Sequence, residues 1–269
     1  MRSVGTRIRI AIVVVCAVVF LVCCGLLVGI LMGYARDERV NDDINQGFPV
    51  IDDLEDKEAT AEEGVKVLSD MSAEMKEQYA YLMELKATYP DVVGYVSIPS
   101  VDIRYPVVQT TNNEYYLDHL ITGEKGSSGT VFVDCRCDPN PRTAKNTVLY
   151  GHNMNNRTMF HNIEKLFEKD EFLKGTVEYI TEEGIFIYKP LSVYRANEKD
   201  SFDRYRFADD EAYLAYCEEV VEKSWFEESR EVSCPEDSGV ITFVTCTNFI
   251  KTERYIYQAV LDRIYLPED

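Results

Sequence analysis

Apolar residues follow three patterns along this chain, and the first is a continuous run near the amino terminus. Residues 10–32 carry no charged side chain. About 20 apolar residues, at a rise of about 1.5 Å each, cross the roughly 30 Å hydrocarbon core of a bilayer. Arginines precede the run and acidic residues follow it, which places the amino terminus in the cytoplasm. We therefore predict a cytoplasmic segment at residues 1–9 and a transmembrane anchor at residues 10–33.

A cleaved signal peptide is the alternative interpretation of this run. Gly33-Tyr34-Ala35 is a small-x-small triplet of the kind found at cleavage sites. The run is longer than a usual signal-peptide core, however, so we prefer a retained anchor. In that case everything after about residue 34 lies on the extracellular face of the cell membrane.

The second pattern is helical and follows an acidic stretch. Residues 34–57 are acidic and poor in large apolar groups, which predicts a tether. Between residues 58 and 89 apolar residues recur at three- and four-residue steps, the spacing of an amphipathic helix, and Pro90 ends it. These residues are Val65, Leu68, Met71, Met75, Tyr79, Leu82 and Leu85. We expect this helical segment to open the main domain, residues 58–269.

The third pattern is a series of short segments rich in Val, Ile, Tyr and Thr. Repeated short strands with turn residues between them predict a β-barrel or sandwich. The expected strands cover residues 92–98, 105–109, 130–134, 147–150, 177–180, 184–194, 240–246 and 255–266. Two helical stretches interrupt them, one at residues 159–167 and a longer one at residues 209–228, on which Trp225 is expected to share an apolar face with Tyr213.

Composition narrows the function classes. A chain of 269 residues that is 46% hydrophobic is long enough for one sizeable domain. The formal net charge of -19 argues against nucleic acid or an anionic membrane surface as a general partner. Three of the eight cysteines lie in the apolar run, which leaves an odd number outside it. At least one outer cysteine is therefore unpaired if pairing is intramolecular.

Cys246 is the candidate for the unpaired thiol. It ends the predicted strand at residues 240–246, and the polar Thr247-Asn248 comes next. A buried free cysteine is usually an inert small apolar residue. A residue at the end of a strand, in contrast, faces a cleft while the strand holds it rigid.

Only three histidines are available as a base. His119 lies in a mixed stretch, and His161 begins a helix-like run. His152 follows a predicted strand and Gly151, which permits a turn that exposes the imidazole. Arg254 opens the strand after Cys246, so a short connection places the two side chains at one rim of the sheet.

Together these residues resemble the catalytic set of the class B sortases. In that family the cysteine ends a strand in a Thr-Leu-x-Thr-Cys motif, which resembles residues 242–246 here; Phe243 takes the place of leucine and Val244 that of a serine in some members. The histidine lies upstream and the arginine opens the next strand. Four further segments resemble the family in the same order: residues 105–109, 115–117, 129–134 and 146–154. The resemblance covers roughly residues 90–266.

The resemblance implies a fold and an activity. The fold is a sortase-type eight-stranded β-barrel with flanking helices, an amino-terminal helix and a long helix before the last two strands. The activity is that of a cysteine transpeptidase of the thiol-protease class at a Gram-positive surface. It cleaves a carboxy-terminal sorting signal of secreted proteins after threonine, and joins the product to a cell-wall precursor or pilin amine. No cofactor and no metal are implied.

The residue types suit this chemistry. Only a thiolate attacks a carbonyl, and an isolated cysteine–histidine pair, with pKa values of about 8.5 and about 6.5, is mostly neutral near pH 7. Our hypothesis is that Cys246 forms an acyl-enzyme as a thiolate. His152 exchanges protons with the leaving and incoming amines. Arg254 donates hydrogen bonds to the oxyanion or fixes the peptide.

Three other functions compete with this interpretation. A cysteine hydrolase of the cell surface uses the same Cys246 and His152 but releases its product to water. A zinc module is indicated only by Cys135 and Cys137, because no second ligand pair follows at a suitable spacing. A membrane-tethered binding domain without activity requires that alkylation of Cys246 leave function intact.

Overall fold

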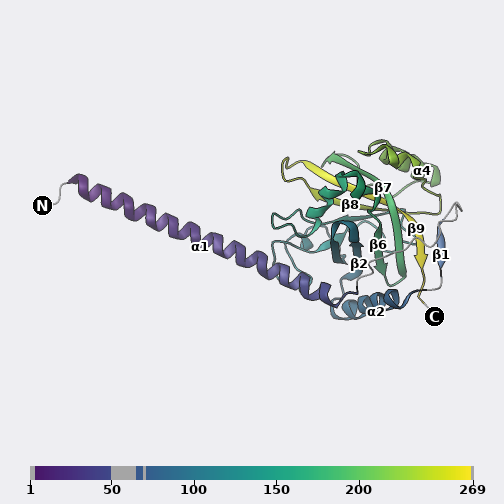
Figure 1. Cartoon of the computed structure of the whole chain (residues 1–269), viewed down its shortest axis with the longest axis horizontal. Coiled ribbons are helices and arrows are strands. Elements are labelled where there is room, and N and C mark those ends of the chain that lie inside the picture. Colours follow the sequence, from purple (N-terminus) through teal and green to yellow (C-terminus); the bar gives the residue numbers. More distant parts are fainter. Residues whose placement is uncertain (1–3, 50–64, 69–70, 268–269) are drawn as a thin grey trace.

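The computed structural model describes residues 4–49, 65–68 and 71–267, and its centre is a closed β-barrel (Figure 1). The barrel order is β9-β7-β6-β2-β3-β4-β5-β8, and β9 pairs with β8 to close it. The strands are β2 (Val92–Ile98), β3 (Ile103–Val108), β4 (Val131–Val133), β5 (Asn146–Tyr150), β6 (Val177–Thr181), β7 (Gly184–Asn197), β8 (Val240–Cys246) and β9 (Glu253–Tyr265). The expected eight-stranded barrel is thus confirmed.

Helices flank this barrel. The α-helices are α1 (Val4–Gly47), α2 (Ala73–Thr88), α3 (Lys169–Leu173) and α4 (Asp210–Glu222), and the 3-10 helices are η1 (Pro99–Val101), η2 (Tyr115–Leu117), η3 (Phe160–Phe167) and η4 (Glu227–Glu231). The expected helix before the last two strands is α4, and Asp209 caps it by accepting a hydrogen bond from the Ala212 amide at 2.8 Å. It ends at Glu222 rather than at residue 228. Trp225 therefore lies beyond the helix and is 60% exposed, contrary to its expected place on the apolar face.

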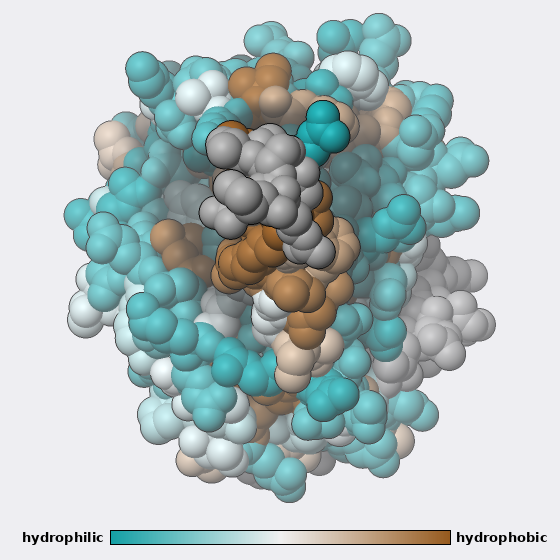
Figure 2. All heavy atoms as spheres, turned by 90° about the vertical axis from the view of Figure 1, so that its left-hand side faces the viewer, coloured by the Kyte–Doolittle hydropathy of each residue, from teal (hydrophilic) through white to brown (hydrophobic). Residues whose placement is uncertain are grey.

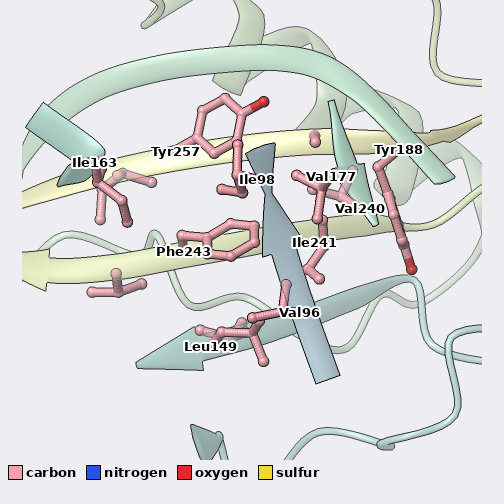
Figure 3. Close-up of a cluster of buried hydrophobic side chains, with 14 of the residues drawn as sticks. Val96, Ile98, Leu149, Ile163, Val177, Tyr188, Val240, Ile241, Phe243 and Tyr257 are labelled. Carbon is pink, nitrogen blue, oxygen red and sulfur yellow. The ribbon is translucent and has the colours of Figure 1, made fainter. Parts of the chain in front are cut away.

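The strands are rich in apolar residues because their side chains fill the interior of the barrel. Figure 3 shows Phe243 and Ile241 of β8 lying with Tyr257 of β9 and with Val96 and Ile98 of β2 in one cluster. All of these side chains are buried. Every residue of β8 before Cys246 is buried, since one face lines the barrel and the other is covered, and Cys246 is the first to be exposed. The strand therefore fixes the position of Cys246 firmly.

Helix α1 combines the predicted apolar run with part of the predicted tether. Residues Ile8–Gly47 include a window of mean hydropathy 3.3 that is 0% buried, and Figure 1 shows the helix projecting away from the barrel. This agrees with a membrane-spanning helix, although a signal sequence has the same properties. The expected tether at residues 34–57 is different in the structure, because the helix continues to Gly47 and packs on the barrel. Residues 50–57 of that segment lie outside the described residues.

The acidic stretch packs because its polar and apolar residues share one helical face. Asp37, Asn41, Ile44 and Phe48 recur at three- and four-residue steps and are all buried. Asp37 accepts hydrogen bonds from the Ser127 hydroxyl at 3.1 Å and from a neighbouring amide, and the Phe48 ring stacks on Tyr95 with centroids 3.6 Å apart. A prediction based only on large apolar residues does not include this buried face, because Asp37 and Asn41 are polar.

The predicted helical segment at residues 58–89 is also only partly confirmed. Its second half is α2, whose residue Ser72 caps the helix by accepting from the Met75 amide at 3.2 Å. Lys66–Leu68 instead forms β1, which pairs in parallel with the end of β9, beyond the residues that β8 covers. Three residues are too few for their hydrophobic periodicity to distinguish a strand from a helix. The segment forms a strand because the free edge of β9 offers it hydrogen-bond partners. Residues 58–64 lie outside the described residues.

A buried carboxyl group beneath α2 gives a prediction about stability. Glu178 of β6 is 3% exposed, its Oε2 accepts from Gln78 Nε2 at 3.2 Å, and burial raises its pKa to about 7. The folded protein therefore keeps a proton that the unfolded chain loses above about pH 4.5. Stability consequently falls as the pH rises from about 4.5 to 7.

Replacing Glu178 with glutamine is expected to remove this loss. The new amide supplies a donor for Gln78 Oε1, which is buried without a partner. We expect Glu178→Gln to stabilise the domain by up to about 3 kcal/mol at pH 8 and much less at pH 5, as measured by urea unfolding of residues 34–269. Glu182→Gln, on an exposed carboxylate nearby, is the control. An equal effect of Glu178→Gln at both pH values would contradict the raised pKa of Glu178 in the folded protein.

Candidate active site

Two parallel strands bring the candidate histidine and cysteine to one end of the barrel. In the pairing of β5 with β8, Tyr150 lies opposite Val244, and the Gly151 amide donates to the Val244 carbonyl at 3.3 Å. His152 and Cys246 each come two residues after this matched pair. Glycine is required before the histidine, because a Cβ at Gly151 would lie 2.7 Å from the Phe160 ring. The structure therefore places His152 and Cys246 at the same rim.

The antiparallel partner of β8 adds the arginine. Arg254 is directly opposite Cys246 in the pairing of β8 with β9. Opposed residues of an antiparallel pair share one face of the sheet, with their Cβ atoms about 5 Å apart. The predicted proximity of Cys246 and Arg254 is thus seen in the register. Cys246 ends β8, Arg254 lies at the start of β9, and His152 follows the end of β5.

The imidazole of His152 is oriented by a backbone carbonyl. Its Nε2 lies 2.8 Å from the Leu117 oxygen. A carbonyl oxygen only accepts hydrogen bonds, so Nε2 carries a proton in this contact. Nδ1 is then the ring nitrogen left to take up or release a proton. Leu117 belongs to η2, in one of the segments on which the family resemblance rests.

Asn153 connects the histidine loop to the end of β8, and it was missed among the candidate residues. Its Nδ2 donates to the Cys246 carbonyl at 2.9 Å, while its Oδ1 accepts from Asn248 at 3.2 Å and lies 2.7 Å from Nδ1 of His161. Its position directly after His152 was the sequence feature that could have identified it. The amide group fixes the spacing between the loop that bears His152 and the end of β8, which bears Cys246.

The guanidinium of Arg254 is held by groups on its own side of the barrel. Nη1 donates to the Lys251 carbonyl at 2.8 Å and to the Glu253 carbonyl at 3.0 Å. Nη2 donates to Glu198 Oε2 at 2.9 Å, from a residue just after β7. The Arg254 side chain is 19% exposed and that of Glu198 is 39% exposed. No local sequence feature identified Glu198, because 56 residues separate it from Arg254.

Removing this carboxylate is expected to weaken the orientation of Arg254. We expect Glu198→Gln to lower kcat about tenfold with KM nearly unchanged, since the ion pair is partly exposed and two carbonyls still hold Nη1. Steady-state cleavage of a peptide with a sorting signal, the substrate that the resemblance implies, measures both constants. Glu227→Gln, on a carboxylate that is 90% exposed, is the matched control. A change confined to KM or to thermal stability would contradict an orienting role.

The other outer cysteines occupy different environments. Cys137 is buried in the main core, and this burial raises the pKa of its thiol to about 12. Cys217 of α4 and Cys234 share a thiol hydrogen bond, which raises the pKa of Cys234 and lowers that of Cys217. Cys135 is half-buried, whereas Cys246 is exposed. Accessibility therefore favours Cys246 as the nucleophile.

The two remaining histidines are both held by neighbouring groups. His119 stacks on the Tyr115 ring, and its Nδ1 lies 2.7 Å from Asp118. His161 contacts Asn153 through Nδ1 and Glu164 through Nε2, the latter at 3.1 Å. Within the part of the chain that the structure describes, no group of three His, Cys, Asp or Glu side chains is placed to hold a metal ion.

A buried polar network holds β8 against its neighbours. The Thr242 hydroxyl donates to Asn146 Oδ1 on β5 at 2.8 Å and accepts from Gln258 Nε2 on β9 at 3.0 Å. All three side chains are buried and hydrogen-bonded, which makes the network rigid. A strand fixed on both sides presents the thiol of Cys246 at a constant position. A thiol, an imidazole and a guanidinium so arranged are suited to acyl transfer.

Comparison with known proteins identifies the family of this chain. A family model described as the sortase domain matches residues 96–262. The chain is 31% identical over 167 residues to Sortase B of Listeria monocytogenes, an alignment that covers 61% of this chain and 66% of the relative. It is 27% identical over 157 residues to Sortase B of Staphylococcus aureus, with 58% and 63% covered. The chain thus spans slightly less than two thirds of each of these relatives.

Solved structures of related proteins share the fold. A mutant form of Clostridium perfringens sortase B superposes with a TM-score of 0.69 at 26% identity, covering 83% of this chain and 97% of that chain. A Staphylococcus aureus sortase B–substrate complex gives a TM-score of 0.62 at 25% identity, with 68% and 85% covered. The family model, at residues 96–262, spans β5, β8 and most of β9, the strands at whose ends the three candidate residues lie.

Proposed function

Since this chain belongs to the sortase family, we propose that it is a membrane-anchored class B cysteine transpeptidase of a Gram-positive cell surface. Its substrates are secreted proteins with a carboxy-terminal sorting signal that contains proline and threonine. It cleaves after the threonine and joins the new carboxyl end to an amine of a cell-wall precursor or a pilin. The observation that carries this proposal is the opposition of Cys246 and Arg254 across β8 and β9, at the rim where His152 follows β5.

In the first half of the reaction, the Cys246 thiolate attacks the carbonyl carbon of the threonine. The carbonyl electrons move to oxygen, and the Arg254 guanidinium donates hydrogen bonds to the resulting oxyanion. The peptide C–N bond then breaks, and the leaving amine takes a proton from the His152 imidazolium. A thioester on Cys246 and a neutral His152 remain.

The second half reverses these roles. The acceptor amine attacks the thioester carbonyl and gives a proton to His152, and the new amide forms as the thiolate leaves. The Cys246 thiolate and the His152 imidazolium are both restored, so the reaction needs no external cofactor. Water in place of the amine would give a hydrolase, which makes the fate of the thioester the deciding property.

The anchor is proposed from the length and composition of α1. Its apolar part spans a bilayer, and the preceding arginines favour an amino terminus inside the cell. The main domain then lies on the extracellular face. Packing of residues 34–48 on the barrel supports retention of α1, because the helix continues without interruption into the domain.

Trapping the thioester tests the proposal directly. The full chain in detergent is mixed with peptides that carry different sorting motifs, and intact mass is recorded within seconds and after addition of hydroxylamine. We expect one motif to add the mass of its amino-terminal fragment to Cys246, and hydroxylamine to remove it. Absence of any adduct from a protein whose Cys246 still reacts with an alkylating reagent would contradict the proposed acyl transfer.

A further inference from the structure

The connection between β8 and β9 displays two large apolar side chains beside the nucleophile. Phe249 is 84% exposed, the highest value for a large apolar side chain among the described residues, and Ile250 is 53% exposed. The loop itself is well held: the Thr247 hydroxyl donates to the Ile250 carbonyl at 3.1 Å, and the Glu253 amide donates to the same carbonyl at 3.0 Å. The loop therefore presents this apolar pair to the outside in a defined conformation.

The domain begins where the apolar part of α1 ends. The predicted transmembrane segment ends at Gly33, and the next residue, Tyr34, already packs against the main core. Asp37 and Asn41 make further contacts with the barrel within the next two turns. No spacer separates the membrane-spanning part of α1 from the domain, so the face of the domain around Tyr34 lies against the bilayer surface.

The β8–β9 loop belongs to this same face. A short series of contacts connects it to α1: Asn248 bonds to Asn153, Asn153 forms an isolated bridge with Met159, and the Met159 sulfur lies 3.7 Å from Asn41 Nδ2. Figure 1 shows the loop, in yellow, at the end of the barrel toward which α1 leaves. Figure 2 views that face and shows apolar surface near its upper edge as well as around α1.

We propose that Phe249 and Ile250 insert into the interface of the bilayer and form a second membrane contact beside α1. The inference rests on the membrane anchor in the proposed function. Two apolar side chains suit the acyl boundary, and the adjacent exposed Lys251 suits the phosphate level of zwitterionic lipids. Because the protein carries a net charge of -19, the contact is apolar rather than electrostatic and tolerates salt. It holds Cys246 close to the membrane surface.

Tryptophan fluorescence in vesicles of brominated phosphatidylcholine tests this contact. The chain has one tryptophan, so Trp225→Phe gives a silent background for the full-length protein. Phe249→Trp then reports on the loop. Val67→Trp reports on β1, which Figure 1 shows at the opposite end of the domain, and the Val67 side chain is 59% exposed. Both replacements are at exposed positions, and a thermal unfolding transition at the wild-type temperature confirms that each variant is folded.

We expect brominated lipid to lower the fluorescence of Phe249→Trp at least about twofold, in low and high salt alike, and to leave Val67→Trp unchanged. Equal responses of the two variants would overturn the proposal. A signal from Phe249→Trp that depends on protein density in the vesicles, and not on bromine, would also overturn it, because the loop would then contact a second copy of the chain.

Flotation of the vesicles separates this inference from the proposed function. Protein that fails to float with lipid would overturn both the anchor and the loop contact. Protein that floats without quenching overturns the loop contact alone. Quenching in a protein that forms no thioester would leave the loop contact standing and refute only the transpeptidase.

Discussion

Cys246→Ala is expected to abolish both cleavage and transfer of sorting peptides. In the proposed mechanism the thiolate sulfur of Cys246 is the attacking atom, and an alanine side chain offers no group that forms an acyl intermediate, so kcat/KM should fall by about 10⁵-fold or more. Initial rates with a fluorogenic peptide measure the loss. The side chain of Cys246 is exposed and its strand is held by the buried Thr242 network, so the variant should fold normally.

Cys135→Ala is the matched control for this replacement. Cys135 is half-buried, and its contact with Asn113 uses the backbone amide, which the substitution retains. Activity should therefore stay within about twofold of the wild type. Residual turnover in Cys246→Ala, or equal losses in the two variants, would exclude Cys246 as the sole nucleophile.

His152→Gln is expected to have the second largest effect. Glutamine is able to donate to the Leu117 carbonyl as Nε2 of His152 does, but it has no group that exchanges protons near neutral pH. Proton transfer by a positioned side chain contributes about 10²- to 10⁴-fold, and we expect a loss of about 10³-fold in kcat/KM. The remaining activity should lose the pH dependence that the histidine confers, as measured between pH 5 and 9.

His119→Gln serves as the comparison for His152. Its imidazole stacks on Tyr115 and bonds within its own loop, so the replacement should cost little activity. An unchanged pH profile in His152→Gln would assign proton transfer to another group. His161 would then be the next candidate, since Asn153 connects it to the carbonyl of Cys246.

Local patterns predict the strands and the proximity of Cys246 and Arg254, whereas the eight-stranded barrel and the place of His152 in the candidate site were implied by the resemblance to class B sortases. A continuous apolar strand such as residues 240–246 is buried on both faces, and its last residue is where the chain turns polar. Register then decides the rest: once β8 and β9 form a hairpin of known length, Arg254 must lie close to Cys246. These inferences use separations of fewer than ten residues.

Features that depend on distant partners were not predictable in the same way. Helix α1 continues through the acidic stretch because Asp37 and Asn41 find partners on the barrel, and no local rule assigns a carboxylate to a buried position. The strand β1 forms because β9 has a free edge. Glu198 reaches Arg254 only through the length of β7. In each case a tertiary contact overrides the local preference.

The fate of the acyl-enzyme tests the central claim most directly. The full chain is incubated with the sorting peptide that it cleaves, with and without an amine acceptor such as triglycine, and the products are separated by mass. We predict that the amine converts the cleaved peptide to an amide at the threonine carboxyl group, and that Cys246→Ala gives neither product. Cleavage that yields only the free acid at every acceptor tried would contradict a transpeptidase and identify a surface hydrolase instead.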